Sequence, residues 1–223
     1  MTYYVRVRAY RLVGTTNVYS AYSTVVQGKP IPSTPVITVA SLGYNSLKAT
    51  WATISGASGY EVSYSTAQAG TYTVLPLTTS VSAWIPGLLT NTVYYVRVRA
   101  YRLVGTVKVY SAYSTVIQGK PTPSTPVITV TRVSSTSLKV NWTGISGAGG
   151  YEVWKSTGTN TTYTQLTAGT NTTYTQLTTV TTTYYTNSAL VTATNYNYKV
   201  RAYRLVETIK VYSYFSAILS GTP

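Results

Sequence analysis

The chain has 223 residues, of which 44% are hydrophobic and only 9% charged, and its 17 Lys and Arg outnumber its acidic residues to give a formal net charge of +14. It contains no Cys, no His and no Asp, which excludes disulfides, thiolate metal sites and the usual nucleophile–base pairs of catalysis. The length is enough for about two globular domains of ~100 residues each. No run approaches the ~20 apolar residues that a membrane-spanning helix needs, so we expect no such span.

One segment occurs three times in the chain, and its first copy lies in the N-terminal region, residues 1–30. In the middle copy, Tyr94 to Val104, apolar and polar side chains alternate with period two, which predicts a strand. Its two sides carry Tyr94, Val96, Val98 and Ala100, and Tyr95, Arg97, Arg99 and Tyr101. Unpaired arginines cannot face an apolar core, so we expect the first side to point inward.

Residues 1–30 by themselves are expected to form only the last two strands of a β-sandwich. A lone two-stranded hairpin is marginally stable, and the inner face of this one would carry Tyr3, Val5 and Val7. Two explanations are open: the sequence is a window of a longer domain array, or the hairpin completes a sandwich in a neighbouring chain and so builds a polymer.

Two proline-rich stretches, Pro30–Pro35 and Pro121–Pro126, indicate the boundaries of a repeat. Alternate prolines fix φ and remove backbone donors, which predicts short, stiff, extended connectors. We therefore expect full domains at residues 31–121 and 122–223. The repeat offset is 98 − 7 = 91 residues and then 200 − 98 = 102, because Gly158–Ala168 is duplicated from Gly169 onward.

The first full domain contains alternating segments and turn signals but no helical period. The predicted strands cover Val36–Val39, a run with Leu47, Ala49 and Trp51 inward, Tyr60–Ser65, Thr71–Leu75, Val81–Ile85, Tyr94–Leu103 and Val109–Ile117. The second domain repeats the pattern, with Leu138, Val140 and Trp142 inward, a turn at Gly147–Gly150 and a strand at Tyr151–Lys155. This pattern predicts an all-β chain of tandem seven-stranded sandwiches.

Several motifs resemble fibronectin type III domains over essentially the whole chain. They are the Ser/Thr-x-Leu-Lys-x-x-Trp run, Gly-Tyr-Glu-Val at the start of the third strand, a Leu six residues before the strand Tyr, and Tyr-x-Val-x-Val-x-Ala. The resemblance implies a core of Trp51, Trp142, Leu88 and Leu190, with Tyr94 and Tyr196 as corner tyrosines. The third copy departs from it at Tyr198, where Val is expected. The phrase Lys-Val-Tyr-Ser-Ala-Tyr-Ser is similar to repeats of secreted and surface proteins of Gram-positive bacteria.

The three carboxylates are Glu61, Glu152 and Glu207. Glu61 and Glu152 occupy equivalent repeat positions, so they are not a catalytic pair in one site; we expect each to face a neighbouring Lys or Arg. Three carboxylates are also too few for a calcium site. The sequence therefore predicts a non-catalytic protein without a cofactor or metal.

The best candidate binding surface is the outward row Tyr95, Arg97, Arg99, Tyr101 and Arg102. Aromatic and guanidinium groups on one sheet face can stack on sugars and pair with phosphate or carboxylate. The alternative is that the row packs across strands against Tyr110 and Tyr113. Asn160 and Asn171 match the N-glycosylation pattern, as Asn141 does inside a predicted strand.

Taken together, the sequence predicts a structural and adhesive module in an extracellular, cell-surface or filament-forming bacterial protein. Its expected partners are copies of itself or neighbouring domains, and an anionic cell-wall polymer or other polysaccharide attracted by the positive charge. Nucleic acid is disfavoured because no recognised motif accompanies that charge. The alternatives are a carbohydrate-binding or spacer module of a secreted polysaccharide-degrading enzyme, and a virion decoration domain.

Overall fold

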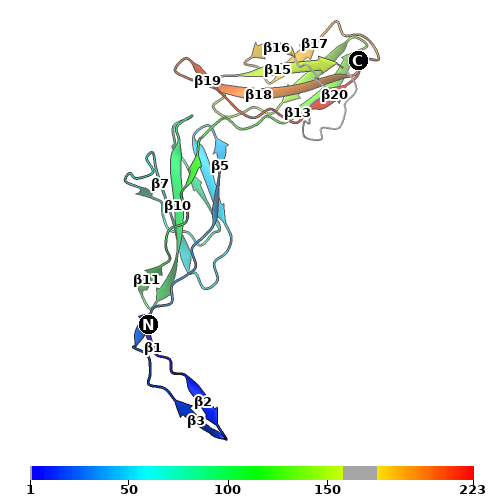
Figure 1. The fold of residues 1–223 in the computed structure, drawn as a ribbon. Helices are drawn as coiled ribbons and strands as arrows, with labels where there is room; N and C mark the ends of the chain where they lie inside the picture. Colours follow the sequence, from blue (N-terminus) through cyan, green and yellow to red (C-terminus); the bar gives the residue numbers. More distant parts are fainter. Residues whose placement is uncertain (1, 158–174) are drawn as a thin grey trace.

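The computed structural model describes residues 2–157 and 175–223, and this part of the chain is built from strands joined by turns and loops. Two β-sandwiches follow one another, and a narrow pair of hairpin ladders precedes them (Figure 1). The predicted all-β architecture of tandem sandwiches is confirmed. The described residues include no helix long and apolar enough to cross a bilayer.

The first sandwich is made of two antiparallel sheets. One sheet has the order β5–β6–β9, with β5 at Ile37–Gly43, β6 at Ser46–Trp51 and β9 at Ser82–Ile85. The other has the order β11–β10–β7–β8, with β7 at Gly59–Ser65, β8 at Thr73–Val74, β10 at Tyr94–Val104 and β11 at Val107–Tyr110; β12, Ile117–Gly119, also pairs with β10. The long strand β10 therefore lies at the centre of its sheet.

The second sandwich repeats this order. Its smaller sheet is β13–β14–β17, with β13 at Ile128–Ser134, β14 at Ser137–Trp142 and β17 at Tyr184–Asn187. Its larger sheet is β16–β15–β18–β19, with β15 at Gly150–Thr157, β16 at Thr175–Val180, β18 at Tyr196–Val206, β19 at Ile209–Tyr212, and β20, Leu219–Gly221, beside β18.

The cores form where the alternation predicted them. Along β10 the side chains of Tyr94, Val96, Val98 and Ala100 are buried, so the predicted inward side is confirmed. Trp51 and Leu88 pack in the same core, and Trp142 and Leu190 pack in the core of the second sandwich.

The corner tyrosines have the geometry that the resemblance implied. The hydroxyl of Tyr94 accepts a hydrogen bond from the backbone N–H of Leu89 at 3.0 Å, and that of Tyr196 accepts one from Val191 at 2.9 Å. Each bond ties the start of a central strand to the loop five residues upstream. This satisfies a buried hydroxyl and fixes the loop, as in the tyrosine corner of related sandwiches.

One predicted strand, Val109–Ile117, is wrong as a continuous element because it divides into β11 and β12. Between them the hydroxyls of Ser111 and Ser114 accept the backbone N–H groups of Ala100 and Val98, at 3.0 and 3.1 Å. Side-chain acceptors thus replace part of the strand ladder, which is the local competition expected of serine. Within residues 2–157 and 175–223 each sandwich consequently shows eight strands, because the predicted seventh strand is divided in two.

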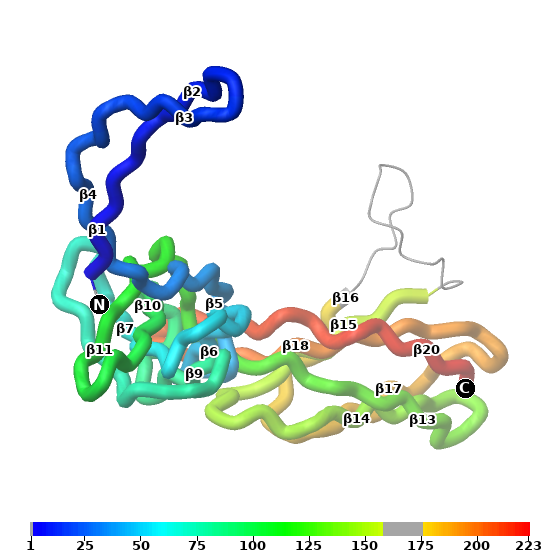
Figure 2. The backbone as a smooth tube through the Cα atoms, turned by 90° about the horizontal axis from the view of Figure 1, so that it is seen from below, coloured from blue at the N-terminus to red at the C-terminus, as the bar shows by residue number. Residues whose placement is uncertain are grey.

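The N-terminal residues form two short ladders. β1, Tyr3–Val5, pairs with β4, Val26–Gly28, and β2, Tyr10–Val13, pairs with β3, Thr16–Tyr19. Figure 2 shows that these strands project away from the first sandwich. Most of the duplicated segment of the second sandwich, with Asn160 and Asn171, lies outside the described residues.

Candidate functional site

Two arginines of the candidate binding row, Arg97 and Arg99, lie on the outer face of β10, where tyrosine rings cover them. The guanidinium carbon of Arg97 lies 3.8 Å from the ring centroid of Tyr72 and 4.0 Å from that of Tyr113. That of Arg99 lies 3.8 Å from the centroid of Tyr110 and 4.6 Å from that of Tyr113. Cation–π contacts of this kind hold Arg97 and Arg99 against the sheet, so these two members of the row pack on tyrosines.

A carboxylate completes the arrangement. Arg99 lies opposite Glu61 in the antiparallel pairing of β10 with β7, and it donates from Nε and Nη2 to the two Glu61 oxygens at 2.9 and 3.1 Å. The hydroxyl of Tyr113 donates to Glu61 Oε1 at 2.7 Å. A bidentate, charge-assisted pair with a third donor is the strong form of such an interaction.

The second sandwich holds the equivalent pair with a different set of neighbours. Arg201 donates to Glu152 Oε2 at 2.8 and 3.0 Å, and Lys210 and the Tyr212 hydroxyl donate to Oε1 at 3.2 and 2.9 Å. Phe215 occupies the place of Tyr113 and cannot donate, and Tyr212 supplies the hydroxyl instead. The prediction that both glutamates face neighbouring cations is confirmed.

These contacts shift the acid–base equilibria of both carboxylates. Burial of Glu61 favours its neutral form, but the hydrogen bonds from Arg99 and Tyr113 and the Arg99 charge outweigh burial and lower its pKa. At Glu152 burial acts in the same sense and is outweighed by hydrogen bonds from Arg201, Tyr212 and Lys210, so this pKa is also lowered. Both groups are therefore carboxylates at neutral pH.

We expect these pairs to make the stability of the sandwiches depend on acid pH. A pKa below the unfolded-state value, about 4.3 for Glu, means that the contribution is complete above about pH 5 and is lost as the pH falls through the folded-state pKa. The double variant Glu61→Gln/Glu152→Gln should consequently lose less stability than the natural chain between pH 6 and pH 3. Urea unfolding at a series of pH values measures this, and parallel curves for the two proteins would contradict it.

The other members of the candidate row differ in exposure. Tyr101 alternates with Arg97 and Arg99 and is not part of the core cluster, but it is buried, so it is not open to a ligand as expected. Its ring lies over Gly59, where a Cβ would come within 2.6 Å of the Tyr101 hydroxyl oxygen, and this explains the Gly of Gly-Tyr-Glu-Val. Tyr95 is half-buried and Arg102 is exposed. Of the five residues, Arg102 is thus the one whose charge is most open to solvent.

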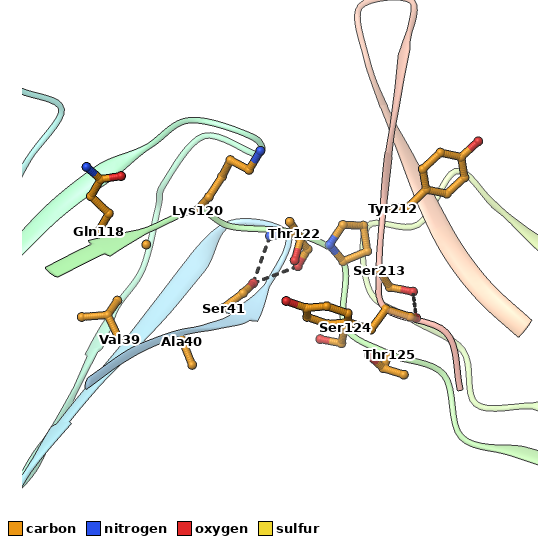
Figure 3. Close-up of a pocket in the computed structure, with 13 residues that line it drawn as sticks. Val39, Ala40, Ser41, Gln118, Lys120, Thr122, Ser124, Thr125, Tyr212 and Ser213 are labelled. Atoms are coloured by element: carbon orange, nitrogen blue, oxygen red, sulfur yellow. Dashed lines mark hydrogen bonds between the residues drawn. The ribbon is translucent and has the colours of Figure 1, made fainter. Parts of the chain in front are cut away.

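A second feature is the joint between the sandwiches, which begins at the proline connector. Ser41 Oγ accepts the backbone N–H of Thr122 at 3.0 Å and donates to the Thr122 carbonyl at 3.1 Å, while Ser124 Oγ donates to the carbonyl of Leu42 at 3.1 Å. Figure 3 shows Ser41 against the connector, and Tyr212 and Ser213 of the second sandwich on the far side of a cleft of about 670 Å³.

Direct contact between the sandwiches involves Tyr44, in the turn between β5 and β6. The guanidinium carbon of Arg204 lies 4.5 Å from the centroid of the Tyr44 ring, and Arg204 Nη1 donates to the Gly147 carbonyl at 2.9 Å. The ring also packs on Gly147, where a Cβ would collide with it and where φ is +70°. Gly147 therefore serves both a left-handed turn and a close approach between domains.

Sequence reasoning missed this joint. It identified the prolines and the turn at Gly147, but the aromatic partner lies more than 100 residues earlier in a turn of the other sandwich. One signal was present: the position equivalent to Tyr44 in the second sandwich, 91 residues later, is Ser135. An aromatic residue in a single copy of a repeat indicates a contact that this copy alone makes.

No protein-family model matches the sequence. A crystal structure of the FN1–FN3 domains of chicken CNTN1 is 17% identical, covers 97% of this chain and 77% of its own, and has a TM-score of 0.38. A two-domain fibronectin type III segment of chicken tenascin is 21% identical, covers 86% of this chain and 98% of its own, and has a TM-score of 0.40. The strand order and the corner tyrosines of the chain itself define its fold.

Proposed function

We propose that the chain is a structural spacer: a series of fibronectin-type-III-like sandwiches held at a fixed angle in an extracellular or cell-surface protein or filament. The observation that carries this proposal is the joint. A proline connector alone restricts the chain locally, whereas here side chains of both sandwiches contact one another beyond the connector. A spacer of this kind transmits position and force from one end to the other.

The joint supports the proposal through interactions that resist rotation in different directions. The Ser41 and Ser124 hydrogen bonds fix the connector to the first sandwich. The stacking of Arg204 on Tyr44 fixes the second sandwich to the same turn. Interfaces between domains of one chain are mobile unless such contacts restrain them, so loss of the ring should release the angle.

We expect Tyr44→Ala to broaden the distribution of distances between the two sandwiches. The chain has no Cys, so spin labels attached at Lys48→Cys and Thr186→Cys report only on this pair of exposed strand positions. Pulsed electron paramagnetic resonance should give a narrow distribution for the parent and a broad one for Tyr44→Ala. Ser135→Ala, the equivalent turn position of the second sandwich, should leave the distribution narrow. Equal widths in parent and Tyr44→Ala would refute the rigid joint.

A second candidate function, adhesion to anionic polymers, is favoured by the charge. Seventeen cationic side chains stand against three carboxylates, and two of those carboxylates are buried in ion pairs. The outer surface is therefore strongly positive, and exposed charges such as Arg102 are available to a polyanion. The same attraction would serve a carbohydrate-binding module of a secreted enzyme or a virion decoration domain.

We expect the chain to be retained on immobilised heparin at ~0.05 M salt. It should be released before the salt concentration reaches about 1 M, where the Debye length is only about 3 Å and the charge attraction is screened. Dextran, an uncharged polysaccharide, serves as the control and should not retain it. Equal retention on both polymers would point to sugar stacking instead of charge. Absence of retention on heparin at low salt would remove adhesion by charge from consideration.

A further inference from the structure

The N-terminal hairpin already has the conformation of the closing strands of a sandwich. β1 pairs with β4 and β2 with β3 in the registers of β10 with β12 and β11: Tyr3 faces Gly28 as Tyr94 faces Gly119. The serine contacts recur as well, since Ser23 Oγ accepts the backbone N–H of Val7 at 3.0 Å, as Ser114 does for Val98 at 3.1 Å. Little rearrangement is then needed for the hairpin to take the place of β10–β12.

The face that is core in the first sandwich is uncovered in the hairpin. Val5 and Val7 are 52% and 67% exposed, whereas their counterparts Val96 and Val98 are both 0% exposed. Covering such side chains is favourable because it removes apolar surface from water. The hairpin therefore presents an apolar face of known shape together with an open strand edge, Tyr4–Tyr10, where β10 has β7 as its neighbour.

The first sandwich shows which surface covers this sequence. Residues 3–29 differ from 94–120 only at Thr16, Asn17 and Val26, and Val107, the counterpart of Thr16, is exposed. The residues that face the core are therefore almost unchanged. In the first sandwich β7 supplies a carboxylate opposite Arg99, which is the counterpart of Arg8. It also supplies the glycine beneath Tyr101, the counterpart of Tyr10. A covering strand of the same kind carries Gly-Tyr-Glu-Val.

The hairpin distinguishes between the two kinds of half-sandwich that the chain contains. Val5 corresponds to Val96, which shares a core with Ile85, and to Tyr198, which accepts a hydrogen bond from Asn187 at 2.8 Å. A valine placed against Asn187 would leave that buried amide without its hydrogen-bond partner, which is unfavourable. The hairpin thus fits a half-sandwich of the first kind.

We propose that residues 3–29 are a docking element that binds a half-sandwich with the chemistry of residues 31–93, completing its core with Val5 and Val7. The two sandwiches of the chain hold their own closing strands, β10–β12 and β18–β20, so neither leaves this place free. The binding mode is strand addition combined with core completion. It does not depend on the rigidity of the joint.

The test uses the full chain and, as a probe, a fluorescently labelled peptide of residues 31–93, which lacks its own closing strands. Anisotropy should show saturable binding of the peptide to the natural chain. Val5→Lys/Val7→Lys should weaken it roughly hundredfold or more, since two charges would enter an apolar core. Leu12→Lys/Val13→Lys is the matched control and should bind normally, because the counterparts Leu103 and Val104 are each 46% exposed in the finished sandwich.

A reciprocal exchange tests the specificity. The peptide carrying Ile85→Asn should bind the natural chain poorly and should bind better to the chain carrying Val5→Tyr, which restores the Asn–Tyr pair of the second sandwich. Equal binding to the natural and Val5→Lys/Val7→Lys chains would overturn the proposal, because the peptide would then be exchanging with β10–β12. A dimer of the chain that Val5→Lys/Val7→Lys abolishes would also overturn it, since two hairpins would then cover each other.

Discussion

Trp51→Ala is expected to lower the free energy of unfolding of the first sandwich by about 3–5 kcal/mol. The side chain is 7% exposed, and its ring packs edge-on against Tyr60 with centroids 5.2 Å apart. Tyr60 in turn accepts the backbone N–H of Ile54 at 2.9 Å, so the cavity would reach the turn before β7. Against a total stability of 5–15 kcal/mol for a typical domain, such a loss leaves the sandwich marginal.

Thermal or urea unfolding of the variant measures this effect. Trp84→Ala is the matched control: Trp84 lies in the same sandwich but is 60% exposed, so its removal should change stability by less than ~1 kcal/mol. Trp51→Phe should retain most of the stability, because the buried indole Nε1 of Trp51 has no acceptor among the described residues. An unchanged melting temperature for Trp51→Ala would mean that the core is organised around other residues.

The second large effect is expected from the buried Asn187–Tyr198 pair. In the first sandwich these positions hold Ile85 and Val96, both fully buried. In the second, Asn187 Nδ2 donates to the Tyr198 hydroxyl at 2.8 Å, and Tyr198 is 0% exposed. Burial, only partly offset by this hydrogen bond, raises the pKa of Tyr198 to about 12.

Each single exchange should therefore be strongly destabilising. Asn187→Ile leaves the tyrosine hydroxyl buried without its donor, at a cost of about 1–3 kcal/mol. Tyr198→Val leaves the Asn187 amide without its hydrogen-bond acceptor and also opens a cavity. We expect it to lower the free energy of unfolding by roughly 3 kcal/mol or more. The double variant Asn187→Ile/Tyr198→Val restores the pair of the first sandwich and should be more stable than the sum of the two losses predicts.

A double-mutant cycle from urea unfolding gives the coupling between the two positions. We expect a coupling free energy of about 1–3 kcal/mol in the compensating direction. Additive losses would indicate that the two changes are tolerated independently. The same tyrosine should also weaken the second sandwich at alkaline pH: its folded-state pKa is raised, so its contribution is complete below about pH 10 and is lost as the pH rises.

The sequence predicted the core because the core follows from local alternation. Valines two residues apart on one side of β10, with arginines on the other, leave a single orientation that does not bury charge, and this orientation is found. The glutamate–cation pairs follow for a similar reason, since three carboxylates stand among 17 cationic side chains. Repetition of the motifs gave the number of sandwiches directly.

Features that depend on particular distant neighbours could not be read in the same way. Whether the arginine row binds a ligand or stacks on tyrosines depends on where Tyr72 and Tyr113 come to lie, and neither is adjacent in sequence. Tyr198 departs from the valine expected at its position, and its hydrogen-bond partner Asn187 lies in a different strand, β17. Ile85 and Val96 of the first sandwich correspond to Asn187 and Tyr198 of the second, a paired exchange in which polarity and volume change together.

The interruption of the last strand had a weaker signal. Val109–Ile117 alternates well enough to predict one strand, and two serines, Ser111 and Ser114, lie within it. In the structure their hydroxyls accept backbone N–H groups of β10, so the chain leaves the ladder between β11 and β12. Side-chain competition for backbone groups is local chemistry that a periodicity argument does not contain.

The measurement that tests the spacer account most directly is extension of the natural chain by force from its two ends. We predict two separate unfolding events, each lengthening the chain by on the order of 30 nm, because each sandwich has its own core and closing strands. Trp51→Ala should weaken one event and leave the other unchanged. A single event that releases both sandwiches together, or a continuous extension without discrete steps, would contradict a spacer made of independent sandwiches.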